Sequence, residues 1–595
     1  MKPDRRLAAL RDALAARDLA GMLVPRADEH LGEYIPASAD RLRWLTGFTG
    51  SAGLAIVLAE TAALFTDGRY QTQVRAEVDP SLFALRHITD EPPDAWLADT
   101  LRPGDRLGYD PWLHAEEGLA KLRRAVERAG ASLVPVEPNP IDALWTDRPA
   151  PPASPVVPHP AQFSGEEGAA KRARIGEAVA AAGAQAAVLT APDSIAWLLN
   201  IRGDDVPFNP VALAFAILEA DGRATLFIDP ARIDPVCAAH LGNQVSVQPR
   251  AAFGPALDRL GAAGASVLVD PRTTPVRVAQ RLEAAGARLV AESDPVALPK
   301  ACKNTVEQAG ARQAHARDAV ALCRFLAWLD RTAAGAVTET EAAARLLACR
   351  AEGERFRGES FPAISGAGPN GAIIHYRVSA ATDRVLCPGD LYLIDSGAQY
   401  LDGTTDVTRT LLIGAPGAEI GEQRDRFTRV LKGHIALATL RWPKGIAGPH
   451  IEAMARRALW DAGLDYDHGT GHGVGSYLSV HEGPTGLSRA ARPIPLAPGM
   501  ILSNEPGFYL PGRWGIRLEN LVMVTQAPIE GAAKPFLAFE TLTLAPFDRR
   551  LIETSLLSDS ERSWIDTYHA RVLDEVGPRL DGPDRAWLAD ACRPL

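Results

Sequence analysis

Two aspartates lie inside or beside strongly apolar, strand-like runs. Asp395 is embedded in LYLIDSG, and Asp406 precedes VTRTLLIG. A buried carboxylate is costly unless a cation or a hydrogen-bond donor compensates its charge. The intervening Asp402-Gly403 predicts a turn, so we expect the two aspartates on neighbouring strands of a hairpin. Their side chains would face each other if the turn centres near Tyr400 and Gly403 forms a bulge.

Two glutamates lie in similar surroundings further along the chain. Glu505 is in NEPGFY, and Glu519 in IRLENLV comes directly before a strand-like run. A carboxylate among such apolar neighbours again favours a bound cation. Taken singly, these acids have simpler explanations, because either aspartate could cap a turn and Glu519 could face water from an edge strand. The hypothesis of a shared site therefore depends on all four acids together.

Histidines accompany these acids. HGTGHGVG places His468 and His472 four residues apart among glycines, which let the backbone come close to a ligand. His481 follows in SVHEGP, and His375 lies in AIIHYR. A single histidine is more often structural than a ligand. Four of the chain's 13 histidines nevertheless lie beside such turns and strand ends, so we treat them as candidate site residues.

Four carboxylates and one imidazole form a hard, oxygen-rich ligand set. Such a set suits Mn²⁺, Co²⁺, Fe²⁺ or Zn²⁺ in five- or six-coordination better than a closed structural zinc site does. Because carboxylates can bridge, five side chains can hold two metals. Two metals about 3.5 Å apart can share a hydroxide nucleophile and polarise a carbonyl group. The ligand set therefore predicts a hydrolase.

Proline-rich breaks divide the chain that must position these residues. The run at 149–160 (PAPPASPVVPHP) is predicted to be an extended linker, and a softer break lies near 294–300. The predicted domains are 1–148, a linker and second domain at 149–296, and a third domain at 297–595. The first two segments resemble diverged copies of one unit with alternating strands and helices, which predicts α/β layers. Each copy has a short apolar strand, a Trp-containing segment and a strand that ends in aspartate, at 21–25, 41–50 and 62–70 and again at 186–190, 194–203 and 224–232.

The third segment mixes helices and strands. A helical pattern runs from Thr305 to Ala333, and the last forty residues are predicted to form a docked helical tail. Strands are expected at 391–400, 406–414, 500–509 and 515–524, and further helices at 422–440 and 450–462. Each candidate acid therefore lies in or beside a predicted strand.

Composition limits the classes of function. The 595 residues are 47% hydrophobic and 23% charged, as in soluble globular proteins, and the net charge of -10 argues against nucleic acid as a partner. Six scattered cysteines form no CxxC pair, so neither a zinc knuckle nor a disulfide framework is predicted. The sequence has neither a signal-peptide core nor an uncharged apolar run of about 18 residues. We therefore expect a cytoplasmic protein without a membrane partner.

The order and wording of these motifs resemble the pita-bread metallopeptidases. This family contains methionine aminopeptidase, prolidase, creatinase and aminopeptidase P, and the resemblance is greatest to the three-domain, cytosolic form of aminopeptidase P. It rests on IDSGAQYLDGTTDVTRT, HGTGHGVGSYLSVHEGP, LSNEPGFY and GIRLEN, with GPNGAIIHY, GFTGSAG and TDGRY elsewhere, and it covers nearly the whole chain. It implies an α/β and α+β multidomain fold, with two creatinase-N-like α/β domains before a pita-bread catalytic domain.

The resemblance also implies a role for each metal-binding candidate. Asp395 would chelate one metal and His472 would bind the other. Asp406 and Glu519 would bridge the pair. Glu505 would bind a metal and accept a proton from the bridging water. Manganese is the metal that the resemblance favours, with zinc and cobalt as alternatives.

Further residues acquire roles in the same way. The resemblance implies that His375, His468 and His481 line the substrate site. Of these, His375 and His481 would contact the substrate carbonyl and stabilise the oxyanion. Arg517 would support Asp395 from behind, and Tyr509 would hydrogen-bond near the bridging water.

The function implied by the resemblance is removal of an N-terminal residue that precedes proline, by a homodimer. An Xaa-Pro bond offers no N–H and fixes φ, so general peptidases position it poorly. One alternative is a prolidase limited to dipeptides, and another is a non-catalytic pita-bread binding protein. The complete ligand set disfavours the second, and two N-terminal domains favour the aminopeptidase over the first. Relatives often have HYxP where this chain has HYRV, so selectivity beside His375 stays open.

Overall fold

The structure, a computed structural model, describes residues 1–332 and 334–595. The chain forms two compact units. The first comprises Met1–Ala161 and Glu166–Ala297, and the second comprises Gln162–Gly165 and Leu298–Leu595. In the part of the chain that the structure describes, no helix is both long enough and apolar enough to cross a membrane.

The first half of the first unit contains a six-stranded sheet with the strand order β4-β3-β2-β1-β5-β6. Its strands β1 to β3 form an antiparallel meander, and the remaining neighbours are parallel. The strands are β1 (Gly21–Pro25), β2 (Leu54–Leu58), β3 (Ala62–Thr66), β4 (Ala84–His87), β5 (Arg106–Tyr109) and β6 (Ser132–Pro135). The helices are α1 (Pro3–Ala15), α2 (Arg41–Thr46), α3 (Gln71–Glu77), α4 (Pro93–Thr100), α5 (Glu116–Arg128) and α6 (Pro140–Leu144).

The second half repeats this plan with the order β12-β11-β10-β8-β13-β14. Its antiparallel and parallel pairings match those of the first sheet one for one, so the predicted repeat is confirmed. The strands are β8 (Ala186–Leu189), β10 (Phe215–Glu219), β11 (Ala224–Phe227), β12 (Val245–Gln248), β13 (Ser266–Val269) and β14 (Arg288–Ala291). The helices are α8 (Gly168–Ala181), α9 (Pro192–Leu199), α10 (Pro235–Leu241), α11 (Phe253–Ala262) and α12 (Val276–Ala284).

The proline-rich run between the two halves is extended, as predicted. It pairs through the two-residue strand β7 (Val157–Pro158), which lies against β9 (Ile201–Arg202), and through a single bridge between Val156 and Ile233. The short helices α7 (Ala161–Ser164) and α13 (Ala297–Ala301) lie where the chain passes between the units. Proline cannot donate to a sheet ladder, which explains why this run forms no longer strand.

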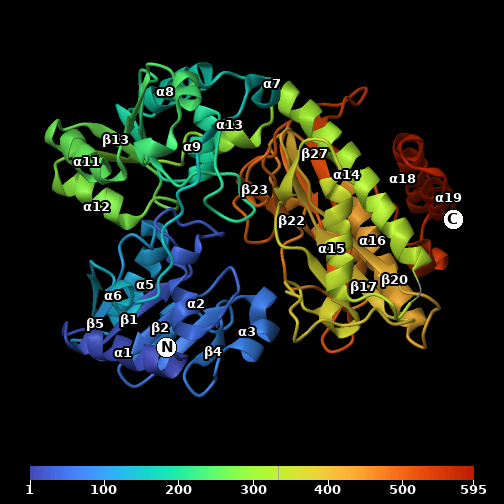
Figure 1. The fold of residues 1–595 in the computed structure, drawn as a ribbon, viewed down its shortest axis with the longest axis horizontal. Helices are drawn as coiled ribbons and strands as arrows, with labels where there is room; N and C mark the ends of the chain where they lie inside the picture. The colour runs from blue at the N-terminus through green and yellow to red at the C-terminus, as the bar shows by residue number, and fades with distance from the viewer. Residues whose placement is uncertain (333) are drawn as a thin grey trace. The chain divides into compact units, whose positions relative to one another are not determined.

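Helices cover the strands of the second unit. The long helix α14 begins at a capping box formed by Asn304 and Glu307. It packs against α15 (Figure 1) and against β19. It ends at Arg331; Ala333, the predicted end of this helix, lies outside the described residues. The C-terminal helices contact α14, as expected of a docked tail. The helices are α14 (Thr305–Arg331), α15 (Glu339–Ala351), α16 (Ile420–Ala438), α17 (Ala453–Trp460), α18 (Asp559–Val576) and α19 (Gly582–Ala591).

Four sheets build the rest of the second unit. The largest has the order β21-β28-β27-β24-β22-β23, and the others are β16-β17-β20, β15-β18-β19 and β25-β26. Their strands are β15 (Phe356–Glu359), β16 (Ile364–Ala367), β17 (Leu391–Ser396), β18 (Ala398–Tyr400), β19 (Gly403–Thr404), β20 (Val407–Leu412), β21 (Arg441–Pro443), β22 (Gly471–Gly473), β23 (Glu482–Leu487), β24 (Ile501–Asn504), β25 (Gly507–Leu510), β26 (Trp514–Arg517), β27 (Asn520–Gln526) and β28 (Phe536–Thr541).

The hairpin that carries the two aspartates has a different register from the predicted one. Tyr400 pairs with Gly403, so the turn is Leu401–Asp402 and no bulge forms at Gly403. Asp395 therefore lies opposite Thr408 rather than opposite Asp406. Because side chains alternate between faces, Thr408 and Asp406 share a face, and the two aspartates remain diagonal neighbours on it.

Candidate active site

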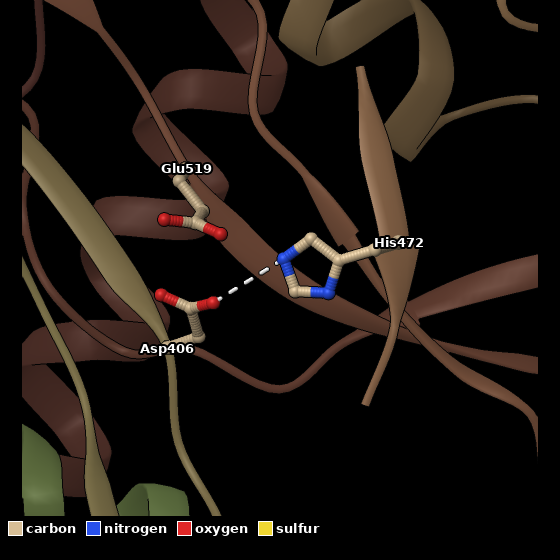
Figure 2. A group of neighbouring side chains, drawn as sticks. All are labelled: Asp406, His472 and Glu519. Carbon is tan, nitrogen blue, oxygen red and sulfur yellow. Dashed lines mark ion pairs between the residues drawn. The ribbon is translucent and has the colours of Figure 1, made fainter. Parts of the chain in front are cut away.

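Three predicted ligands from distant parts of the chain meet in the second unit. Asp406, His472 and Glu519 each offer one ligand atom, and these atoms lie within 4.8 Å of one another. Within this group, His472 Nε2 lies 3.5 Å from Asp406 Oδ2 (Figure 2). Asp406 precedes β20, His472 lies in β22, and Glu519 lies between β26 and β27. Three side chains arranged in this way could hold a metal ion.

The other two predicted ligands border this group. Glu505 Oε1 lies 3.6 Å from His472 Nε2. Asp395, near the end of β17, is close enough to Asp406 and Glu505 for both charges to raise its pKa. All five predicted ligands thus belong to one cluster. Glycine makes this approach feasible, because a Cβ on Gly471 would lie 1.9 Å from the carbonyl oxygen of Ser503.

The carboxylates are in an environment that strongly disfavours their charge. Burial, together with the neighbouring carboxylates, raises the pKa of Asp395 to about 6 and that of Glu519 well above its usual range, and Arg517 opposes the shift at Asp395. Asp395 Oδ1 and Asp406 Oδ1 are buried and accept no hydrogen bond from the described residues. Crowded, buried and unsatisfied carboxylate oxygens are the donors that a divalent cation would neutralise, so the residues present fit a metal centre.

His472 is oriented as a metal ligand should be. Its Nδ1 lies 2.9 Å from the carbonyl oxygen of Gly473, which can only accept, so Nδ1 carries the proton and Nε2 faces the carboxylates. Burial alone would lower the pKa of this imidazole. The nearby Asp406 and Glu505 outweigh burial and raise the pKa of His472 to about 9.

These shifts predict a metal affinity that depends strongly on pH. In the metal-free protein the cluster retains protons on Asp395 below about pH 6 and on His472 below about pH 9, and a metal must displace them. Binding should therefore release protons, and the apparent Mn²⁺ affinity should fall as the pH is lowered from about 8 to about 5. Calorimetric titration of metal-free protein, in two buffers of different protonation enthalpy, measures both quantities. An affinity that did not change with pH would contradict the electrostatic description of this cluster.

A chain of hydrogen bonds connects Asp395 to a second part of the site. Arg517 donates from Nη2 to Asp395 Oδ2 at 2.6 Å and from Nη1 to the Tyr509 hydroxyl at 2.7 Å. Tyr509 in turn lies 2.9 Å from His468 Nε2. His468 Nδ1 donates to the carbonyl of Gly469, so its Nε2 accepts from the tyrosine. Tyr509 and Arg517 lie on the paired strands β25 and β26, which holds this chain in place.

The other two predicted histidines, His481 and His375, are positioned by different contacts. The His481 ring packs edge to face on His472, with ring centroids 4.3 Å apart, so the structure brings His481 beside a predicted ligand. His375 follows Ile374, whose carbonyl accepts a 3.4 Å hydrogen bond from Arg517 Nη2. The next residue, Tyr376, donates its hydroxyl proton to the buried Glu339 at 2.8 Å. The loop that carries His375 is therefore fixed on both sides of the histidine.

Sequence analysis missed two hydroxyl groups that hold the ligands. Thr408 Oγ1 donates to Glu519 Oε2 at 2.8 Å. Ser503 Oγ donates to Glu505 Oε1 at 3.1 Å and accepts from the backbone N–H of His472 at 2.9 Å. Each lies two residues from a predicted ligand in a strand-like run. The period of two in a strand was therefore a signal that could have identified both.

A buried ion-pair cluster, also missed, lies beside His481. Glu482 accepts from Lys300 Nζ at 2.8 Å and from Lys303 Nζ, and all three side chains are almost completely buried. Glu482 also pairs with Gly473, next to the ligand His472. The cluster fixes the strand that follows His481 to α13 and to the residues just before α14. The partners are 182 and 179 residues apart in the sequence, so no local pattern could identify them.

Comparisons with known families cover almost the whole chain. Residues 309–526 match metallopeptidase family M24, and residues 535–595 match the C-terminal region of peptidase M24. Residues 6–144 and 147–307 each match a creatinase/prolidase N-terminal domain. Two such matches agree with the repeated sheet of the first unit.

Individual relatives also match over almost the whole chain. The chain is 41% identical to a probable Xaa-Pro aminopeptidase P of Aspergillus fumigatus, over 99% of this chain and 92% of the relative. It is 38% identical to aminopeptidase P2 of Arabidopsis thaliana, over 96% and 86%. A solved structure of an X-prolyl aminopeptidase from Caenorhabditis elegans, described as a cytosolic enzyme with a di-nuclear active site, superposes with a TM-score of 0.94 at 34% identity and covers 100% of both chains.

Proposed function

Since the chain belongs to metallopeptidase family M24, we propose that it is an Xaa-Pro aminopeptidase, which hydrolyses the bond between an N-terminal residue and a penultimate proline. The observation that carries this function is the meeting of Asp406, His472 and Glu519 in one cluster, within a chain similar from end to end to such enzymes. The chain is therefore a hydrolase, and the complete ligand set disfavours a binding protein that has lost its metals.

The proposed ligands are the five clustered residues. Asp395 and His472 would each hold one of two metals, Asp406 and Glu519 would be shared by both, and Glu505 would hold a metal and accept a proton. In the metal-free protein burial raises the pKa of Glu505, and His472 is the main opposing influence. Bound divalent cations supply a nucleophile from water at neutral pH and polarise the scissile carbonyl. We propose Mn²⁺ because of the resemblance, with Zn²⁺ or Co²⁺ as alternatives.

The surrounding residues are proposed to orient the substrate. His375 and His481 would donate hydrogen bonds to the substrate carbonyl and to the oxyanion that develops on it. His468 lines the same site, and Tyr509 and Arg517 hold it through the hydrogen-bond chain to Asp395. Because that chain ends on a ligand, it also couples the substrate site to the metal site.

Peptide length separates the aminopeptidase from a prolidase. With Mn²⁺-loaded protein, we expect Ala-Pro-Ala to be cleaved to free alanine and Pro-Ala. Ala-Ala-Ala should be cleaved about 10²-fold less efficiently, because its second residue lacks the proline ring. Hydrolysis confined to the dipeptide Ala-Pro would identify a prolidase. If metal-loaded protein hydrolysed none of these peptides, the proposed function would be wrong.

The proposal also includes the location, the oligomeric state and the domain boundaries of the protein. We propose that the protein is cytoplasmic, as the Caenorhabditis elegans relative is described to be, and that it forms a homodimer. The proposed domains are 1–148, 149–296 and 297–595, and the separate sheets of the two halves of the first unit support the first boundary. Molar mass in solution, measured by light scattering, tests the homodimer.

A further inference from the structure

Arg409 is a buried arginine in the strand that follows Asp406, on the face opposite the proposed metal ligands. It lies in β20 next to Thr408 and is only 1% exposed. Because successive side chains of a strand point to opposite faces, Arg409 points away from the face that carries Asp406 and Thr408. Its guanidinium lies 4.5 Å from the centre of the Phe547 ring.

The guanidinium donates hydrogen bonds to two parts of the chain, which also contact each other through Tyr568 and Asn520. On one side, Nη1 donates to the carbonyl of Glu519 at 2.6 Å, and Nη2 donates to Asn520 Oδ1 at 2.8 Å. On the other side, it donates to the C-terminal region, to the carbonyls of Ala545 at 2.7 Å and Pro546 at 3.1 Å and to the Tyr568 hydroxyl at 3.2 Å. A single side chain thus bridges a proposed metal ligand and helix α18.

All of these acceptors are uncharged. Burial among them lowers the pKa of Arg409. A buried cation held only by neutral acceptors contributes little to the free energy of folding, because a well-packed apolar side chain of similar size would cost less to bury. Its geometry, in contrast, suits positioning, because a planar guanidinium fixes several acceptors at once.

Glu519 is held from both ends as a result. The Thr408 hydroxyl binds its carboxylate at 2.8 Å, while Arg409 binds its backbone carbonyl. Adjacent residues of one strand therefore fix the side chain and the main chain of the same ligand. Building on the proposed function, we propose that Arg409 is a positioning residue for Glu519, and that through it the C-terminal region around Ala545 and Tyr568 supports the metal centre.

Arg456 provides a matched comparison. It is also 1% exposed, and it donates to Glu452, to Asp465 and to the carbonyls of Tyr466 and His468. None of these acceptors belongs to a proposed metal ligand. Arg456→Lys should therefore lower stability as Arg409→Lys does while leaving the metal affinity unchanged.

The test measures Mn²⁺ binding rather than activity. Metal-free full-length protein is titrated with MnCl₂ by equilibrium dialysis, and thermal unfolding is recorded in chelator. We expect Arg409→Lys to raise the Kd for Mn²⁺ by about 10- to 100-fold in folded protein. Tyr568→Phe, which removes only one hydroxyl, should raise the Kd less, but still more than Arg456→Lys does.

The outcomes separate this inference from the proposed function. If the unsubstituted protein binds Mn²⁺ and both Arg409→Lys and Tyr568→Phe bind it as tightly as Arg456→Lys, the inference is wrong and the proposed function stands. If Arg409→Lys does not fold, Tyr568→Phe decides between the two results. If the unsubstituted protein binds Zn²⁺ or Co²⁺ but not Mn²⁺, the same comparison of variants is made with that metal. Failure to bind any of the three metals would overturn the proposed function and, with it, this inference.

Discussion

Asp406→Asn should leave a folded protein with almost no activity and little bound metal. Asp406 lies 3.5 Å from the imidazole of His472, and its Oδ1 is buried without a donor among the described residues. An amide has one oxygen in place of two and no charge, so it cannot bridge two cations. We expect kcat on Ala-Pro-Ala to fall by about 10³-fold or more, since the lost metal supplies several kcal/mol of transition-state stabilisation. Elemental analysis of the purified variant should show fewer than two metals per chain.

The stability of the same variant should change little in the absence of metal. Asp406 raises the pKa of Asp395 and that of Glu519 by its negative charge, so these carboxylates repel one another in the metal-free protein. Removing one charge relieves this repulsion but also removes the attraction between Asp406 and protonated His472. Because the two effects oppose each other, metal-free Asp406→Asn should unfold at about the same temperature as the unsubstituted protein, as measured by thermal unfolding in chelator. An equally stable but inactive variant would show that Asp406 serves binding and not folding.

Asp402→Asn is the matched control, because Asp402 is a buried aspartate in the same hairpin. Its carboxylate accepts hydrogen bonds from Arg317 and Arg355, and Asp402 is not one of the proposed metal ligands. We therefore expect Asp402→Asn to destabilise the protein and to keep its metals. If Asp406→Asn instead retained both metals and normal turnover, the proposed ligand set would be incorrect.

The sequence was sufficient to identify the face on which the acids lie, but not their exact partners. The Asp402-Gly403 signal located the turn between Asp395 and Asp406, although the turn centre is one residue later than predicted. Such an error shifts the cross-strand partner by two residues. Because the side-chain period of a strand is two, the acids stay on the predicted face although Asp395 pairs with Thr408. Amphipathic alternation therefore predicts faces more reliably than it predicts partners.

Long-range partners were beyond any local pattern. The repeated sheet of the first unit could be predicted, because each copy carries its own strands and turns within a short stretch. The contact of Arg517 with Asp395 came only from the resemblance. Two other contacts could not be predicted, namely Lys300 with Glu482 and Arg409 with Tyr568, because the two residues of each pair are over 150 positions apart in the sequence. Charged residues in apolar runs signal that a partner exists without indicating where it is.

His481→Ala should separate metal binding from catalysis. The His481 ring lies against His472, at a centroid distance of 4.3 Å, but it is outside the group of three whose ligand atoms converge. The following residue, Glu482, is fixed by two buried lysines, so the backbone at this position should survive the substitution. We expect both metals to be retained and kcat to fall by about 10²- to 10³-fold, as for loss of one oxyanion donor. Elemental analysis and steady-state kinetics on Ala-Pro-Ala measure the two effects.

His481→Phe distinguishes hydrogen bonding from packing. Phenylalanine keeps an aromatic ring against His472 but has no N–H to donate to a developing oxyanion. If His481 acts through its N–H, the phenylalanine and alanine variants should lose the same share of kcat while each retains two metals. If His481→Phe kept normal turnover, the ring would serve only to hold His472, and the oxyanion donor would have to be sought elsewhere. The metal content decides between these readings, since a packing role predicts metal loss in the alanine variant alone.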